Sequence, residues 1–262
     1  MTLACLRTPP INEQHKIVEL LEDHLSRLDA ALADVKQAKI KAAQFRMTVL
    51  HSIFNSSTNA EDWKSTSLEK IGVWKTGSTP LSKNPEFQGS DVKFVTPGDI
   101  GYGGKLNSVA RTISSKGADS VRRILPPSVH LVCIGTIGKV AWTKEIVTTN
   151  QQINSLEVDA SANNPEFLMW LLASPGIQEK LWSSSSSTTV PILNKGNLEK
   201  IECSLPSLET QNEVMKFIDI LFSKLEEVLE TTNQLENQSS VLRRSLLQAA
   251  FTGQLTEEVI SV

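Results

Sequence analysis

Four short segments in the middle of the sequence carry residue types that can hold a phosphate or a base edge. Lys75-Thr76-Gly77-Ser78-Thr79 combines a cation and hydroxyls with a glycine that lets backbone amides approach an anion. Gly135-Thr136-Ile137-Gly138-Lys139 is a second amide-rich turn that ends in a cation, and Thr96-Pro97-Gly98-Asp99-Ile100 is a third turn. Asn150-Gln151-Gln152 supplies amides of the kind that pair with adenine. The candidate DNA-contacting residues are therefore Lys75, Thr76, Gly77, Ser78, Thr79, Thr96, Gly135, Thr136, Gly138, Lys139, Asn150, Gln151 and Gln152.

Loops rich in glycine, serine and threonine are also common as plain turns, so each segment alone indicates little. Net charge is −3, and composition by itself therefore does not point to nucleic acid. The acidic excess lies in the last helical segment, where alternating charge is usually a solvated face. Any DNA contact must come from local clusters rather than from the overall field.

The sequence contains no catalytic constellation. It has no P-loop and no dinucleotide fingerprint after a predicted strand. His15, His24, His51 and His130 are scattered, without a cysteine or histidine neighbour at zinc-ligand spacing. Asp91-Val92-Lys93 is similar to the acidic and basic pairing of metal-dependent nucleases, but without a fitting second carboxylate a solvated strand end is favoured. We therefore expect a chain without catalytic or metal-binding residues.

Two long helical segments must position these loops. In residues 206–253 the apolar positions alternate in steps of four and three, which is the 3.5-residue period of a coiled-coil seam. These positions are Val214, Ile218, Leu221, Leu225, Val228, Thr232, Leu235, Ser239, Leu242, Leu246 and Ala249. Shifted by 197 positions, the same pattern lies near the N-terminus at Ile17, Leu21, His24, Leu28, Ala31, Val35, Ala38, Ala42, Phe45, Val49 and Ser52.

Residue identities extend this repeat. Gln14 corresponds to Gln211, Arg46 to Arg243, Leu50 to Leu247 and Phe54 to Phe251, and Pro9 and Pro206 precede the two helices. We expect the copies to pair antiparallel, because one helix enters the middle region and the other leaves it. Their seam or subunit-docking residues would be Leu21, Leu28, Val35, Phe45, Val49, Ile218, Leu221, Leu225, Leu235, Leu242 and Leu246. The weak seam entries His24, Thr232 and Ser239 would fix register or mark where a further helix joins.

The region between the helices changes to short apolar runs separated by turn residues. Strands are predicted at 92–95, 129–134, 139–142 and 70–75, and helical spacing returns over 165–182. The fold class is α+β, with one globular domain flanked by two long helices in an antiparallel coiled coil. The predicted organisation is a lead-in 1–10, a helix 11–57, a recognition domain 58–204, a second helix 205–253 and a tail 254–262.

Composition is that of an ordinary globular protein, with 40% hydrophobic and 21% charged residues. Cys5, Cys133 and Cys203 are odd in number and far apart, which favours reduced thiols over a disulfide framework. No apolar run is long enough for a membrane span, and no signal-peptide pattern opens the sequence. We expect a cytoplasmic protein.

Taken together, these segments resemble the specificity subunit of a type I restriction–modification system. The resembling stretches follow the family's order: Gly77-Ser78-Thr79-Pro80, Val95-Thr96-Pro97-Gly98-Asp99-Ile100, Leu125-Pro126-Pro127, Gly135-Thr136-Ile137-Gly138-Lys139, Thr149-Asn150-Gln151, Leu205-Pro206 with Gln211, Arg243-Arg244-Ser245-Leu246-Leu247 and Ala250-Phe251-Thr252-Gly253. One departure is that the usual member alternates two recognition domains with two helical regions. This chain therefore resembles a half-length form with one target recognition domain.

The resemblance implies that the domain reads one half of a bipartite DNA target while the helices act as a spacer. It implies double-stranded DNA, a methyltransferase (modification) subunit and a restriction subunit as partners, with a homodimer possible and no membrane contact. The chain itself would bind no cofactor, because S-adenosylmethionine, ATP and Mg would be used by the partner subunits. Two alternatives remain, a coiled-coil adaptor whose head binds protein and a stand-alone nuclease.

Overall fold

The computed structural model describes residues 9–56, 62–81, 83–186 and 189–257. The chain forms two compact units, one of residues 1–45 with 221–262 and one of residues 46–220. The first unit contains most of the two long helices. The second contains the strand-rich domain with the last turns of the first helix and the first turns of the second. The predicted α+β class is confirmed.

The long helices are α1 (Ile11–Ser56) and α6 (Leu208–Thr252). Neither contains proline or glycine, and each has a glutamate in its first turn, Glu13 and Glu209. Gly253 ends α6 with a φ of 79°, a left-handed value that favours glycine, and a short helix, α7 (Gln254–Glu257), follows. None of the described helices is long and apolar enough to cross a membrane.

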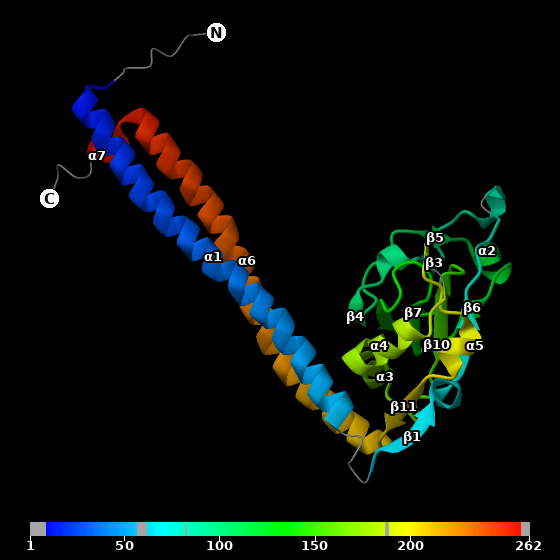
Figure 1. The fold of residues 1–262 in the computed structure, drawn as a ribbon. Helices are drawn as coiled ribbons and strands as arrows, with labels where there is room; N and C mark the ends of the chain where they lie inside the picture. Colours follow the sequence, from blue (N-terminus) through cyan, green and yellow to red (C-terminus); the bar gives the residue numbers. More distant parts are fainter. Residues whose placement is uncertain (1–8, 57–61, 82, 187–188, 258–262) are drawn as a thin grey trace. The chain divides into compact units, whose positions relative to one another are not determined.

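In the first unit the two helices run side by side in opposite directions (Figure 1), as the repeat predicts. Lys39 Nζ lies 2.6 Å from Glu236 Oε2, and Asp29 and Arg243 form a second ion pair between the helices. Positions 39 and 236 differ by 197, the offset of the sequence repeat. An internal two-fold axis therefore passes between Lys39 and Glu236.

The seam of this helix pair is rotated from the predicted one. Leu21, Leu28, Val35 and Val49 on α1, and Ile218, Leu225 and Leu246 on α6, are buried or half-buried as predicted. Phe45, Leu235 and Leu242 are not seam residues, because their side chains are 46%, 44% and 50% exposed. The neighbouring positions Arg46, Glu236 and Arg243 are the less exposed ones.

The predicted and the observed seams share every seventh residue. They differ in the residue between two shared ones, which the prediction places three positions after the first and the structure places four positions after it. Leu25 and Leu32 on α1, and Phe222 and Leu229 on α6, belong to the observed set. His24 and Ala31, which precede Leu25 and Leu32, are exposed instead. Apolar residues stand on both sides of the shared positions, so the pattern fitted either register. The half-buried Leu221 falls in the predicted set alone.

The second unit is built on two small sheets. The first has the strand order β2 (Val73–Thr76), β10 (Ile153–Glu157), β7 (Ser128–Val132), β8 (Val140–Thr143), β4 (Tyr102–Lys105), antiparallel except for the β4–β8 pair. The second has the order β5 (Thr112–Ile113), β3 (Val92–Val95), β9 (Val147–Thr149), β6 (Arg123–Ile124), with β3 and β9 parallel. A core that includes Val95, Ile124, Val132, Val147 and Ile153 draws on both sheets.

Helices complete this domain. They are α2 (Ser115–Asp119), α3 (Pro165–Ala173), α4 (Pro175–Ser183) and α5 (Lys195–Glu199), with 3-10 turns at Leu68–Ile71, Pro85–Phe87 and Pro97–Asp99. Phe167 to Ala173 on α3 are all buried, and the Asn164 side chain caps its first turn. The sequence pattern found β3 with its bounds, found β2, β7 and β8 approximately, and found the helical stretch, but it missed β1, β4, β5, β6, β9, β10 and β11.

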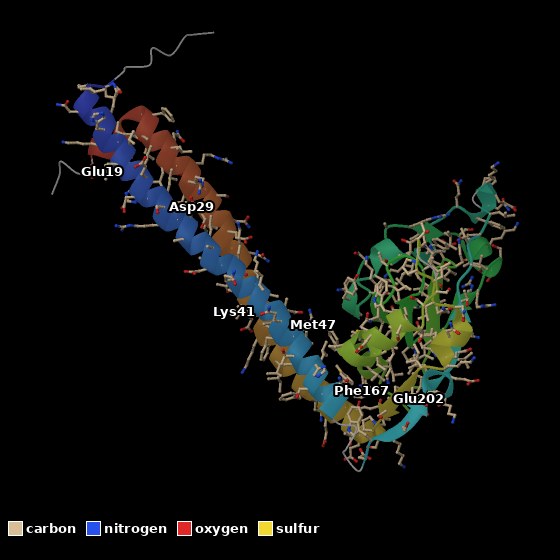
Figure 2. The ribbon with its side chains drawn as sticks, viewed as in Figure 1. Glu19, Asp29, Lys41, Met47, Phe167 and Glu202 are labelled. Atoms are coloured by element: carbon tan, nitrogen blue, oxygen red, sulfur yellow. The ribbon has the colours of Figure 1, made fainter. Side chains whose placement is uncertain are left out.

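The domain joins the helices through a two-stranded sheet of β1 (Lys64–Ser67) and β11 (Glu202–Leu205). Phe167, labelled in Figure 2, packs edge-on against Phe54 of α1 with ring centroids 5.3 Å apart. The Arg46 guanidinium lies 4.9 Å from the Trp170 ring centroid. At the start of α6, the Gln211 side chain accepts from Asn164 N and donates to Asn163 Oδ1. These contacts seat the domain on residues 46–56 and 208–220.

Candidate nucleic-acid interface

Strand register brings the predicted loop segments to one end of the domain. Thr76 at the end of β2 pairs with Asn154, Val132 at the end of β7 pairs with Ile153, and Val95 at the end of β3 pairs with Thr149. The segments that follow these strand ends, and the one that joins β9 to β10, therefore lie together. We call this set the loop cluster, and it comprises residues 76–79, 96–99, 135–139 and 150–152.

The loop after β2 is held directly against the connection between β9 and β10. Gly77 N donates to Ile153 O at 3.0 Å, and Ser78 N donates to Thr149 O at 2.9 Å. A Cβ on Gly77 would lie 2.2 Å from Asn150 O, so the approach requires glycine. Thr79 Oγ1 donates to Gln151 Oε1 at 2.7 Å, which places two exposed polar side chains side by side.

The connection 150–152 carries the chain from one sheet to the other and is tied internally. Asn150 Nδ2 donates to Gln152 Oε1 at 3.0 Å, and Gln152 N donates to Asn150 Oδ1 at 3.1 Å. Asn150 N donates to Val95 O, which fixes the connection to the end of β3. Gln151 is the exposed member of the three.

The remaining two segments face each other across one contact. Thr96 N and Thr96 Oγ1 both donate to Asp99 Oδ2 at 2.8 Å and close the 96–99 turn. Lys139 Nζ donates to Pro97 O at 3.2 Å, so this half-buried ammonium is partly engaged within the domain. Gly135 and Gly138 have φ values of 80° and 93°, in the left-handed region that favours glycine.

The charge of Lys75 does not belong to the loop cluster. Its Nζ lies 2.6 Å from Glu157 Oε2, at the opposite end of β10 from Gln151 and Gln152. Lys75 pairs with Ser155 in the sheet, so its side chain extends along the strands rather than into the loops. The structure thus brings together the predicted residues of the loop cluster and separates the Lys75 ammonium from them.

Sequence reasoning missed Arg122. The structure places its Nη1 2.7 Å from Thr76 O and its backbone N 3.4 Å from Ser78 Oγ, beside the loop after β2. The sequence signal was the Arg122-Arg123 pair just ahead of Leu125-Pro126-Pro127. The position of Arg122 beside the loop after β2 depends on the pairing of β6 with β9, which the sequence does not indicate.

Burial moves the pKa values of two reactive side chains, His130 and Cys133, away from neutral pH. Burial lowers the pKa of His130, which lies between the hydroxyls of Ser128 and Ser155, to about 4. Burial raises the pKa of the Cys133 thiol to about 11. Within the part of the chain that the structure describes, no three His, Cys, Asp or Glu side chains gather as a metal site would need.

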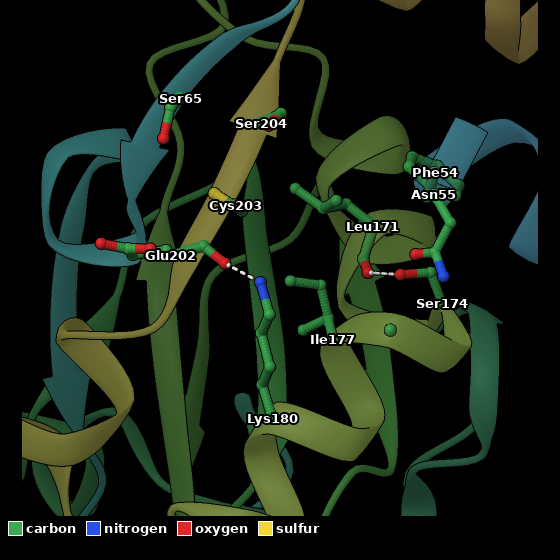
Figure 3. Close-up of a pocket in the computed structure, with 11 residues that line it drawn as sticks. Phe54, Asn55, Ser65, Leu171, Ser174, Ile177, Lys180, Glu202, Cys203 and Ser204 are labelled. Carbon is green, nitrogen blue, oxygen red and sulfur yellow. Dashed lines mark hydrogen bonds between the residues drawn. The ribbon is translucent and has the colours of Figure 1, made fainter. Parts of the chain in front are cut away.

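One cavity in the second unit is lined by no residue of the loop cluster. Figure 3 shows this cavity, of about 210 Å³, where the end of α1 meets α3, α4 and β11. Its lining includes Phe54, Leu171, Ile177 and Cys203, and Lys180 Nζ donates to Glu202 O at 2.8 Å. Burial raises the pKa of Cys203 to about 11. This cavity belongs to the joint between domain and helix.

Sequence comparison finds relatives in one family. Residues 60–237 match the family model described as the type I restriction modification DNA specificity domain. The chain is 32% identical over 188 residues to the type I restriction enzyme HindI specificity subunit of Haemophilus influenzae, covering 71% of this chain and 40% of that protein. It is 24% identical to the EcoBI specificity subunit of Escherichia coli, covering 97% of this chain and 59% of that one. The chain thus spans about half the length of these relatives.

Solved structures share the fold. A chain from a study of complex assembly and conformational transition of the type I R-M system has a TM-score of 0.75 at 19% identity. The HsdS subunit from Thermoanaerobacter tengcongensis has a TM-score of 0.61 at 18% identity. Each match covers 94% of this chain and 60% of the other. The arrangement of long helix, strand-rich domain and long helix is thus shared beyond this sequence.

Proposed function

Because the chain belongs to the type I restriction–modification DNA specificity family, we propose that it binds double-stranded DNA through the loop cluster and reads one half of a bipartite target. The convergence of four polar, glycine-containing segments at one end of the domain carries this proposal. Hydroxyls and backbone amides there supply phosphate contacts, and Thr79 with Gln151 presents a polar pair suited to a base edge. Gln151 is exposed, and glutamine amides are of the kind that pair with adenine.

The helix repeat supports a second recognition domain in the working assembly. Phe54 and Leu50 are 6% and 2% exposed where the domain sits, whereas their repeat counterparts Phe251 and Leu247 are 78% and 38% exposed. Gln14 Nε2 donates to Pro9 O at 2.8 Å, just as Gln211 Nε2 donates to Pro206 O at 3.1 Å. The helix entry is thus built twice, and the second copy offers a seat for another recognition domain.

The partner subunits would dock on the helix pair. Val228, Leu235 and Leu242 recur every seven residues beside the seam of α6 and are about half exposed, with Phe45 in the corresponding place on α1. An apolar stripe of this spacing fits partner helices, as the methyltransferase and restriction subunits would provide. Adenine methylation with S-adenosylmethionine, and cleavage with ATP and Mg, would then belong to those subunits. The chain would act in the cytoplasm as a subunit without catalysis of its own.

A binding experiment tests the proposal. Random duplex DNA is offered to the purified protein, alone and with its methyltransferase subunit, across a salt series, and the bound sequences are determined. We expect an enriched half-site and an affinity that falls steeply with salt. No sequence preference, with a salt dependence no steeper than a nonspecific control, would favour a protein-binding adaptor instead. Light scattering of the complex decides whether one recognition domain is present or two.

A further inference from the structure

Four cations, in the loop cluster or in strands that lead to it, are already engaged inside the domain. Lys75 pairs with Glu157, and Lys93 Nζ lies 2.7 Å from Glu145 Oε2. Lys139 donates to Pro97 O. Arg123 Nε lies 2.8 Å from Asp119 Oδ1, and its Nη2 donates to Ser115 O. Carboxylates compensate the charges of Lys75, Lys93 and Arg123, and the Lys139 ammonium is half-buried. These four side chains are therefore less available to a phosphate than an exposed cation without a carboxylate partner.

Arg122 differs from them. Its side chain is exposed, and among the described residues no carboxylate lies within ion-pair distance of it. The bond from Nη1 to Thr76 O uses one of its five N–H groups and orients the guanidinium beside the loop that carries Ser78 and Thr79. The backbone N of the same residue reaches Ser78 Oγ. An oriented and uncompensated guanidinium at this edge is placed to donate N–H groups to a pair of anionic oxygens.

We propose that Arg122 contacts a phosphate of the DNA backbone and so fixes the loop after β2 against the duplex, the part expected of Lys75 on sequence alone. This inference rests on the proposed DNA binding by the loop cluster. Phosphate rather than base is assigned because the contact to Thr76 O holds the guanidinium at the strand end, beside hydroxyls that also suit phosphate oxygens. The contact would set the register in which Gln151 meets a base edge.

The test compares Arg122→Gln with the neighbouring Arg123→Gln in the full chain with its methyltransferase subunit. Both variants remove one positive charge, but only the first removes the uncompensated one. For Arg122→Gln we expect binding about tenfold weaker at moderate salt, equally for cognate and unrelated duplexes, and a log–log salt slope smaller by about one. For Arg123→Gln we expect the slope of the unchanged protein.

Further outcomes separate the possibilities. Arg122→Lys should restore the salt slope, because the charge returns, but recover only part of the affinity, because the oriented fork is lost. Relaxed preference at one base pair with an unchanged slope would identify a base contact and overturn the phosphate assignment. Wild-type affinity in Arg122→Gln would overturn the inference alone, whereas absence of DNA binding by the unchanged protein would overturn the proposed function as well. Thermal unfolding checks that each variant is folded.

Discussion

At the scale of single residues, Gly77 decides whether the loop cluster can close. Its position leaves no room for a side chain, since a Cβ would meet Asn150 O and Thr149 Oγ1 at 2.2 Å. A Cβ on Gly98, in the neighbouring 96–99 turn, would lie 3.8 Å from Thr96 Oγ1, an ordinary van der Waals distance. Position 77 therefore has no room for a Cβ, whereas position 98 has room for one.

We predict that Gly77→Ala lowers the free energy of unfolding by about 1–3 kcal/mol, because the backbone must move to accept the methyl group. The same change should weaken DNA binding by displacing Ser78 and Thr79. Gly98→Ala serves as the matched control and should change both quantities little. Urea unfolding and the binding assay measure the two effects, and equal losses in the two variants would contradict the packing argument.

His130 makes stability depend on pH. Burial between Ser128 and Ser155 lowers its pKa from 6.5 to about 4. As pH falls from about 6.5 to about 4, the unfolded chain takes up a proton that the folded chain refuses, so stability is lost in that window and not above it. The loss attributable to His130 should reach about 3 kcal/mol near the lower limit.

His130→Gln tests this prediction through the slope rather than the absolute stability. The variant is expected to be less stable at pH 7, because the bonds to both serines change. Between pH 6.5 and 4, however, its free energy of unfolding should fall less steeply than that of the unchanged protein. Parallel curves from urea titrations at several pH values would show that the histidine is protonated in the folded state.

At the scale of elements, the seam register determines which leucines hold α1 against α6. Leu28 is 9% exposed within the seam, whereas Leu235 lies beside it. Leu28→Ala should therefore cost about 2–5 kcal/mol, while Leu235→Ala should stay within about 0.5 kcal/mol. Thermal or urea unfolding of both variants provides the measurement. If Leu235→Ala lowered the free energy of unfolding more than Leu28→Ala does, the seam register predicted from the sequence would be supported instead.

The sequence predicted these elements unevenly, for physical reasons. The long helices follow from a repeat without proline or glycine, and their antiparallel pairing follows from where each copy meets the domain. The seam register does not follow, because apolar residues such as Phe45 and Leu235 adjoin the shared positions. Strands as short as β5 and β6, with two residues each, carry too little alternation to be recognised.

The candidate site was predictable in composition but not in assembly. Glycine, threonine and amide residues marked Gly77, Gly138 and Gln151 as loop positions. That these loops share one end of the domain depends on strand register between distant segments, such as Thr76 with Asn154. The engagement of Lys75 by Glu157, and the place of Arg122, follow from the same long-range pairing.

At the scale of the whole molecule, the helix pair would act as a ruler between two recognition domains. Adding one heptad to both α1 and α6 at opposing positions lengthens the pair by about 10 Å, since an α-helix rises 1.5 Å per residue. In an assembly with two recognition domains, the spacer tolerated in the DNA target should grow by about three base pairs. Selection from duplexes with randomised spacer length measures this change.

A heptad added to α1 alone is the control. It leaves α6 without opposing residues and should reduce stability rather than shift the preferred spacer. An unchanged spacer in the doubly extended protein would contradict the ruler.

The ion pair on the internal two-fold axis has a consequence for partner choice. Lys39 and Glu236 occupy the same position in the two helix copies but carry opposite charges. If two chains aligned α1 with α1 about this axis, lysine would face lysine, and α6 with α6 would bring glutamate against glutamate. Like charges in close contact disfavour both arrangements. This one position, at which the two helix copies differ in charge, thus favours pairing of α1 with α6 over pairing of either helix with a second copy of itself.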